Sequence, residues 1–209
     1  MRHPGSIASG SGRLGRCHNA AMAIVTPLLT PQDVLDMVNR GELLTDQPWE
    51  LVDGEIVWLT ASKGRESQIC IRLIRMMGPF ADAIGAMMFD SSAGFTVGEH
   101  RQQLRCPDVS LVTKERAHII NLDGWASEAP DLAVEVLSEG EYGEAYARTK
   151  VTEYLVAGAK IVWLVHPKRR TIREYLAGSA EFTTYTAEAT ITLDTIAPGF
   201  STEVSSFFP

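Results

Sequence analysis

Apolar residues follow two different periods along this chain, and each period predicts a different kind of element. Short apolar runs at residues 107–112, 132–137 and 161–165 are typical of strands buried on both faces of a sheet. Residues 30–41, 62–78 and 143–157 instead have the side-chain spacing of one helix face. The order helix, strands, helix, strands, helix, strands predicts an α/β domain with a mixed β-sheet flanked by helices.

Local signals mark the ends of several of these elements. Residues 30–33, Thr-Pro-Gln-Asp, predict a helix N-terminus with the threonine as its cap. Asp53-Gly54 lies between two apolar-rich runs and predicts a β-hairpin, and residues 171–186 predict a second antiparallel hairpin. Pro79 is expected to end or kink the second helix, because proline cannot donate the backbone hydrogen bond of a helix interior.

Composition predicts one globular domain preceded by an extension. The 209 residues are 45% hydrophobic, which is ordinary for a chain that buries a full core. Residues 1–21 are rich in Gly, Ser and Arg and show no apolar period, so we expect a disordered extension there and a single domain at 22–209. No window approaches the roughly 18 to 20 apolar residues of a membrane span.

The charge and the cysteines narrow the class of protein. A formal net charge of −7 argues against a coat for nucleic acid or a membrane surface, so any nucleic-acid contact needs a local basic patch. The best candidate patch contains Lys168, Arg169, Arg170 and Arg173, and a solvated hairpin is its alternative explanation. Three cysteines without C-x-x-C spacing argue against a disulfide framework or structural zinc and fit a reducing cytoplasm.

Two carboxylates stand in or beside apolar strands. Asp108 follows Pro107 directly before one apolar run, and Glu135 interrupts the run 132–137. A buried carboxylate is costly unless it is paired or bound to a metal. Asp108 could instead be a turn or cap residue, and Glu135 could pair with an arginine. Because magnesium takes one or two carboxylates and several waters, the two residues together predict a magnesium or manganese site.

Lys150 lies on the predicted helix 143–157, with Tyr146 and Tyr154 four residues away on either side. The three side chains therefore share one helix face. If that face packs on the sheet, the lysine can orient or deprotonate a water and offset charge on a phosphate. An ordinary solvated lysine is the alternative. Burial would lower the pKa of Lys150 and nearby carboxylates would raise it, and the sequence does not fix the balance.

An ordered set of motifs carries a family resemblance. The chain resembles the Uma-type family of putative restriction endonucleases in Pro107-Asp108-Val-Ser-Leu-Val, Glu135-Val136-Leu137-Ser138, Lys150-x-x-x-Tyr154-x-x-x-Gly158 and Val162-Trp163-Leu164-Val165-x-Pro167. That family is a branch of the PD-(D/E)XK nuclease superfamily and was formerly a domain of unknown function. The resemblance covers residues 30–175 and implies a restriction-endonuclease-like core with magnesium-dependent nuclease activity.

The resemblance also implies roles for individual residues. Asp108 matches the aspartate of the PD motif and Glu135 the (D/E), and Val136 would lend its backbone carbonyl to the metal. The usual lysine place, two residues after Glu135, holds Leu137, so the E-x-K element is broken; Lys150 matches the place to which this branch moves the lysine. Glu66 stands where the family tends to have His, and helix capping explains it equally well.

Together these features predict a metal-dependent nuclease that hydrolyses phosphodiester bonds in DNA, with RNA or a special structure as a weaker option. The predicted catalytic residues are Asp108, Glu135, Lys150 and Glu66. The broken E-x-K element and the net charge favour an alternative, a catalytically inactive nuclease-fold protein that binds nucleic acid or regulates. By analogy with enzymes that cut both strands of two-fold DNA, a homodimer is a further expectation.

Overall fold

The structure is a computed structural model that describes residues 28–43, 47–98, 102–138 and 143–209. The extension predicted at residues 1–21 lies outside these ranges. Within them, no helix combines the length and the apolar character needed to cross a bilayer. Cys70 and Cys106 form no disulfide and are half-buried.

A mixed six-stranded sheet is the main layer of the fold, which confirms the predicted fold class. Its strands follow the order β10-β9-β8-β7-β6-β3, and β7 is parallel to β8 while the other neighbours are antiparallel. The strands of this large sheet are β3 (Met87–Asp90), β6 (Val109–Val112), β7 (Leu132–Val136), β8 (Ile161–His166), β9 (Thr171–Leu176) and β10 (Phe182–Tyr185).

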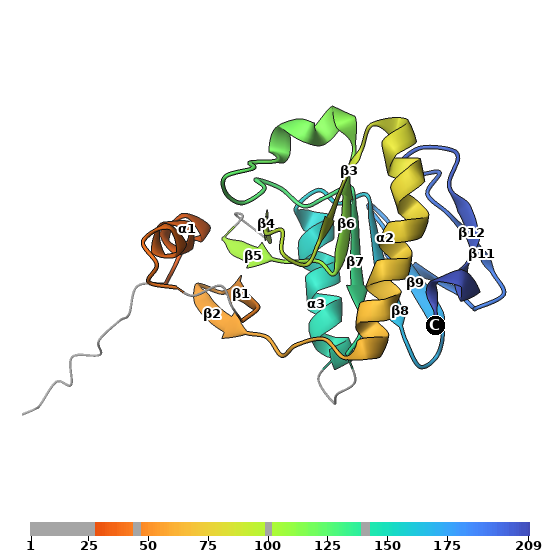
Figure 1. The fold of residues 1–209 in the computed structure, drawn as a ribbon, viewed down its shortest axis with the longest axis horizontal. Coiled ribbons are helices and arrows are strands. Elements are labelled where there is room, and N and C mark those ends of the chain that lie inside the picture. The colour runs from red at the N-terminus through yellow and green to blue at the C-terminus, as the bar shows by residue number, and fades with distance from the viewer. Residues whose placement is uncertain (1–27, 44–46, 99–101, 139–142) are drawn as a thin grey trace, which may run out of the picture.

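Two helices cover opposite faces of the large sheet, α2 (Gly64–Ile84) and α3 (Gly143–Val156) (Figure 1). The α2 side is an apolar core in which Ile69 and Leu73 pack with alternate residues of β6, β7 and β8. The α3 side places Tyr154 against Ala133 of β7. Because side chains alternate along a strand, Glu135 lies on the same face as Ala133 and therefore faces α3.

A smaller four-stranded sheet lies beside α3 (Figure 1). Its order is β2-β1-β5-β4, and α1 (Pro31–Asn39) packs on it. The strands are β1 (Trp49–Val52), β2 (Glu55–Trp58), β4 (Phe95–Val97) and β5 (Gln103–Arg105). The structure confirms the predicted hairpin: Asp53 and Gly54 both have positive φ, 50° and 77°, as a two-residue primed turn requires.

The predicted N-terminus of α1 is also confirmed. Thr30 Oγ1 accepts a hydrogen bond from the Asp33 N–H at 3.2 Å, and the Asp33 carboxylate accepts one from the Thr30 N–H at 2.9 Å. This reciprocal pair satisfies two donors that the first helical turn leaves free. The other end is equally regular, because Gly41 lies just beyond the helix with a φ of 69°.

Of the two expectations for Pro79, that it ends α2 or kinks it, the first is wrong. The helix continues to Ile84 and ends at Gly85, whose φ is 68°. Phe80 and Ala81 follow the proline directly and are buried in the core. Burial of this apolar face outweighs the hydrogen bond lost at Pro79, since tertiary packing supplies most of the stability of a helix in a protein.

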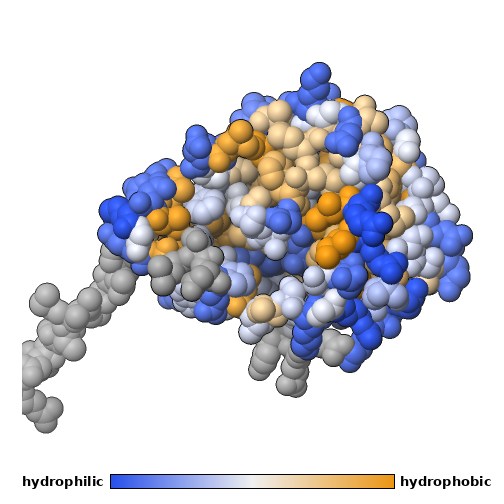
Figure 2. All heavy atoms as spheres, in the orientation of Figure 1, coloured by the Kyte–Doolittle hydropathy of each residue, from blue (hydrophilic) through white to orange (hydrophobic). Residues whose placement is uncertain are grey.

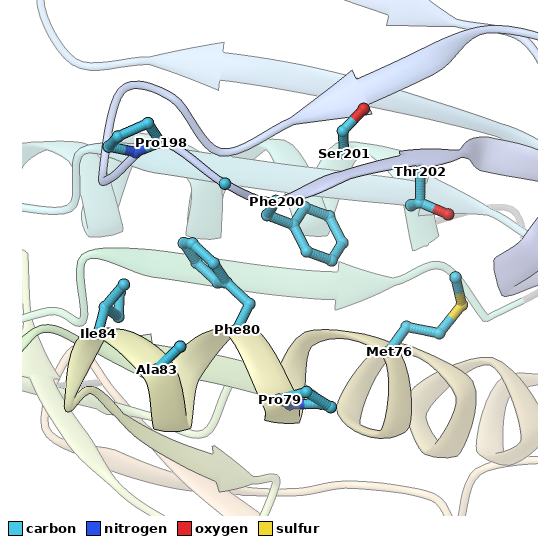
Figure 3. A pocket seen from close by; sticks show the side chains of 10 residues that line it. Met76, Pro79, Phe80, Ala83, Ile84, Pro198, Phe200, Ser201 and Thr202 are labelled. Atoms are coloured by element: carbon cyan, nitrogen blue, oxygen red, sulfur yellow. The ribbon is translucent and has the colours of Figure 1, made fainter.

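The sequence pattern also did not reveal the C-terminal hairpin of β11 (Thr190–Thr192) and β12 (Ser201–Glu203). Residues at the start of β12 and just before it pack onto α2, where the ring centroids of Phe80 and Phe200 lie 5.6 Å apart (Figure 3). A groove of about 600 Å³ runs between α2 and this hairpin. Two short 3-10 helices, Lys114–Ile119 and Val204–Phe207, complete the described elements.

Candidate active site

Asp108 and Glu135 lie side by side at one end of the large sheet. Val109 and Val134 are the outermost pair of the β6–β7 ladder, and Asp108 and Glu135 are the residues directly beyond them. Both residues line the same cleft. Asp108 Oδ2 accepts a hydrogen bond from the Val136 N–H at 2.7 Å, which ties the start of β6 to the end of β7.

Lys150 reaches both of the neighbouring glutamates from α3. Its Nζ lies 3.0 Å from Glu135 Oε2 and 2.8 Å from Glu50 Oε1. Tyr154 shares the helix face and donates its hydroxyl to Glu135 Oε1 at 2.7 Å, while Tyr146 donates to Glu50 Oε2 at 2.9 Å. Only 6% of Lys150 is exposed, so its explanation as a solvated helix lysine is wrong.

Glu50 is the residue of this cluster that sequence reasoning missed. It is fully buried on β1 of the small sheet, between Trp49 and Leu51. Its Oε1 also accepts from the Cys106 N–H at 3.2 Å, and its Oε2 accepts from Arg105 at 2.9 Å. The signal that could have found it is a carboxylate inside an apolar strand, the same signal that singled out Glu135.

Arg105 links the small sheet to α3 below this cluster. Its guanidinium is fully buried and makes two hydrogen bonds with Glu153, at 2.6 and 3.0 Å, besides its bond with Glu50. Tyr146 accepts a further bond from Arg105 at 2.6 Å. A paired guanidinium of this kind fixes the geometry of both carboxylates. Arg105 therefore positions Glu50, and through Glu50 it positions Lys150.

A cleft of about 270 Å³ opens over these side chains, and Asp108, Glu135 and Lys150 line it together with Glu66 and Val136. In Figure 2, hydrophilic atoms (blue) lie in the recess between the part that carries the small sheet and the part that carries α2. Glu66 comes from the first turn of α2 and is buried, and its Oε2 has no hydrogen-bond partner. All four predicted catalytic residues thus meet at one cleft.

The electrostatics of the cleft favour an added positive charge. Burial raises the pKa of Glu135 to about 7, with further contributions from the charges of Asp108 and Glu50, although Lys150 and Tyr154 act in the opposite direction. Burial likewise raises the pKa of Asp108. Burial opposes the charge of Lys150, but its ion pairs with Glu135 and Glu50 outweigh that and raise its pKa. The lysine is therefore protonated at neutral pH.

The donor set fits one hard cation. Among the described residues, no group of three His, Cys, Asp or Glu side chains converges into a metal site by itself. Magnesium does not need one, because it uses one or two carboxylates and fills its other positions with water. Asp108 and Glu135 supply such a pair, and the buried, unpartnered Oε2 of Glu66 adds an acceptor for a water.

The basic residues predicted to contact nucleic acid differ in exposure. Lys168, Arg169 and Arg170 are exposed on the turn that follows β8, and Arg173 is only partly exposed. Arg170 donates to the Pro209 carbonyl at 3.2 Å and lies over the Phe208 ring, and Arg173 forms an ion pair with Glu144. Because β8 is parallel to β7, this turn lies at the same end of the sheet as Glu135.

Comparison with known proteins shows the fold and the family of this chain. A solved structure, described as a putative nuclease belonging to DUF820 from Anabaena variabilis ATCC 29413, matches with a TM-score of 0.69 and 19% identity. The match covers 86% of this chain and 97% of that one, and it shows the fold. Curated proteins give no match. The profile of the Uma2 family, described as "Putative restriction endonuclease", matches residues 33–205. The chain therefore belongs to the Uma2 family.

Proposed function

We propose that this chain is a nuclease that hydrolyses phosphodiester bonds in DNA with the help of magnesium or manganese. The observation that carries the proposal is that Asp108 and Glu135 line one cleft together with Lys150. Membership of the Uma2 family and the nuclease-like fold support the same reaction class. The substrate and the metal requirement are the parts of the proposal that need experiment.

Each residue of the cleft has a defined role in this proposal. Asp108 and Glu135 would hold the cation, with the Val136 carbonyl as a further ligand. When bound, the cation polarises the phosphate and lowers the pKa of the attacking water. Lys150 is protonated and so donates hydrogen bonds and positive charge to the phosphate, rather than accepting a proton. Glu66 would accept a hydrogen bond from a water through its unpartnered Oε2.

Lys168 and Arg169 are the proposed contacts to the phosphate backbone. Both are exposed at the end of the sheet that carries the cleft. Arg170 is exposed beside them and bonds the Pro209 carbonyl, whereas Arg173 is only partly exposed and forms an ion pair with Glu144. Cleavage of both strands of a duplex would call for two copies of the chain, in keeping with the predicted homodimer. The proposed location remains the reducing cytoplasm.

The test is a cleavage assay on plasmid and on single-stranded circular DNA with magnesium, manganese or EDTA. We expect metal-dependent cleavage that Glu135→Gln and Lys150→Met abolish. Lys150→Met keeps much of the apolar stem but leaves Glu50 and Glu135 without their cation, so its rate is compared only where its Tm matches that of the parent. Lys160→Met is the matched control, since Lys160 pairs with Asp131 away from the cleft. Cleavage by Lys150→Met at the parental rate would remove Lys150 from the mechanism.

One observation favours a second function, a catalytically inactive protein that binds nucleic acid or regulates. Leu137 occupies the usual lysine position and is buried with Ala147 and Leu164, so nothing cationic replaces the lysine on β7 itself. If the parent binds DNA but cuts no substrate with any divalent metal, this second function replaces the first. Metal binding to Asp108 and Glu135 without cleavage would likewise replace the first function with the second.

A further inference from the structure

A second pocket adjoins the cleft on the side of the small sheet. It has a volume of about 480 Å³. Thr60, Asp108 and Lys150 line both the cleft and this pocket, so the two hollows meet at the Asp108 and Lys150 side chains. A group bound in the second pocket would therefore stand next to a phosphate bound in the cleft.

Two indole rings form the apolar wall of this pocket. Trp49 and Trp125 lie edge to face, with ring centroids 5.9 Å apart at 86°. Trp125 Nε1 donates to the Pro31 carbonyl at 3.1 Å, which fixes the ring. Gly94 completes the fit, because a Cβ there would come within 2.9 Å of Trp125 and 3.1 Å of Leu104. The wall is thus held in place before any ligand arrives.

The remaining lining combines apolar residues with uncharged polar ones. Gln47, Ser91 and Ser92 are exposed residues that line the pocket, and they present amide and hydroxyl groups. Apart from Asp108 and Lys150, where the pocket meets the cleft, its described lining carries no ionisable acid or base except the Cys106 thiol, whose pKa burial raises to about 12. A flat, neutral group with a hydrogen-bonding edge suits these walls. A phosphate does not, since no free cation lies inside.

We propose that this pocket takes up an unpaired nucleobase of the nucleotide that flanks the scissile phosphate. The inference rests on the proposed nuclease function, because the cleft must hold the phosphate to which that base is joined. A base within a duplex is stacked and paired, so the substrate is a single strand or a duplex with an extruded base. Aromatic rings accept any base, because every base has a π-face. The pocket should therefore distinguish unpaired from paired nucleotides, and it should discriminate less between base sequences.

The experiment measures binding in EDTA, where metal-dependent cleavage cannot occur, by the fluorescence anisotropy of labelled oligonucleotides of about 12 nucleotides. The probes are single-stranded DNA, single-stranded RNA, the DNA duplex, and an abasic deoxyribose-phosphate strand of the same length. Ser91→Trp fills the pocket mouth from an exposed turn, and Trp125→Leu removes part of the wall. Ser201→Trp, exposed beside the groove between α2 and the C-terminal hairpin, is the matched control.

We expect the parent to bind single strands at least about fivefold more tightly than the abasic strand, as stacking of one base on an aromatic ring predicts. Ser91→Trp should abolish that preference, and Ser201→Trp should keep it. A difference between the DNA and RNA arms identifies the sugar that the site prefers. Trp125→Leu is interpreted only where its Tm matches the parent, so Ser91→Trp decides the result if it does not.

Two outcomes separate this inference from the proposed function. If Ser91→Trp binds every probe as the parent does, while Lys150→Met abolishes cleavage in magnesium, the pocket does not take a base and the nuclease function stands. If Ser91→Trp loses the preference for single strands and no protein cuts any substrate, the base pocket stands and the nuclease function falls.

Discussion

Two Pro-Asp pairs begin neighbouring strands of the large sheet, and they lie at opposite ends of it because β6 and β7 are antiparallel. Their backbone roles are equivalent. Asp108, before β6, accepts from the Val136 N–H at the end of β7 at 2.7 Å, and Asp131, before β7, accepts from the Thr113 N–H just after β6 at 2.8 Å. Each aspartate thus fastens the start of its own strand to the end of the other.

The surrounding charges make the two aspartates different. Asp131 lies 2.9 Å from Lys160 and 3.6 Å from Arg116. Burial opposes its charge, but the hydrogen bond from Thr113 and these two cations outweigh burial and lower its pKa. Around Asp108 burial dominates and raises the pKa, since Lys150 is shared with Glu135 and the nearby Glu50 and Glu66 add negative charge. One end of the sheet is neutralised, and the other favours an added cation.

The comparison teaches that a motif on a strand does not determine its own chemistry. The strand supplies the position and the backbone bond, and elements distant in sequence supply the counter-charges. Arg116 from the 3-10 helix Lys114–Ile119 and Lys160 from the residues just before β8 balance Asp131. Glu50, from the small sheet, instead competes with Glu135 for Lys150 at the other end. The excess negative charge of the carboxylates at that end would be balanced by a bound cation.

The largest expected effect is on catalysis. Asp108→Asn should lower the rate of metal-dependent cleavage by about 100- to 1,000-fold, the range seen when one preorganised electrostatic group is removed from an active site. Asp131→Asn is the matched control, because it removes the same group at the other end of the same two strands. Its rate should stay near that of the parent. Equal losses in both variants would show that the effect is structural.

The next largest effect is on the free energy of unfolding. Here Asp131→Asn should lose more than Asp108→Asn, the reverse of the order expected for the cleavage rate. Asp131→Asn leaves Arg116 and Lys160 without their anion, and because the Lys160 side chain is 41% exposed the cost should be about 1 to 2 kcal/mol, less than for a fully buried pair. Asp108→Asn should cost far less, because the raised pKa of Asp108 shows that its charge is disfavoured there. Urea unfolding at pH 7 measures both free energies.

The pH dependence sharpens this second test. The pKa of Asp131 is lowered in the folded chain, so its contribution is present above the ordinary value of 3.8 and is lost as the pH falls through the lowered value. The stability gap between the parent and Asp131→Asn should therefore be constant from pH 7 to about 5 and should close below about 4. A gap that grows towards low pH would contradict the ion-pair explanation.

Much of the fold was predictable because its signals are local. The cap at Thr30, the hairpin at Asp53-Gly54 and the face shared by Lys150 and Tyr154 depend on residues within four positions of each other. What the pattern missed depends on distant packing. The strand β5 has three residues with the charged Arg105 at its end, and its burial depends on Glu50 and Glu153, each about fifty positions away.

The residues of the candidate site also differ in whether local sequence signals mark them. The four predicted residues line one cleft. A charge in or beside an apolar run and the family resemblance both mark Asp108 and Glu135, whereas a shared helix face and the resemblance mark Lys150, and the resemblance alone marks Glu66. Glu50 carries the same signal as Glu135, because it is a carboxylate inside the apolar strand before the Asp53-Gly54 turn. The sign of the shift in the pKa of Lys150 was not predictable, because it depends on the two carboxylates within 3.0 Å that Glu50 and Glu135 bring from different sheets.

A smaller effect is expected on the affinity for manganese. A carboxyl whose pKa is raised becomes protonated as the pH falls through that value, and a protonated carboxyl offers no charge to a cation. With a pKa of about 7 for Glu135, affinity should be constant above pH 7 and should fall about tenfold for each unit below it. Calorimetric titration between pH 5.5 and 8 measures this. Glu135→Gln should bind more weakly and with a flatter profile, and a profile as steep as the parent's would assign the proton to another group.

The smallest effect is expected on the salt dependence of nucleic-acid binding, at the exposed turn after β8. Arg169 is exposed on the turn after β8, at the end of the sheet that carries Glu135, and Glu144 is the carboxylate whose pKa it helps to lower. If Arg169 contacts one phosphate, Arg169→Ala should reduce the slope of log K against log salt by about 0.7 to 0.9 and weaken binding equally for all sequences. Arg75→Ala, exposed in the middle of α2, is the control and should leave the slope unchanged. Equal slopes for the two variants would show that the phosphate backbone of the nucleic acid does not contact Arg169. The substrate would then meet this end of the sheet only at Asp108 and Glu135.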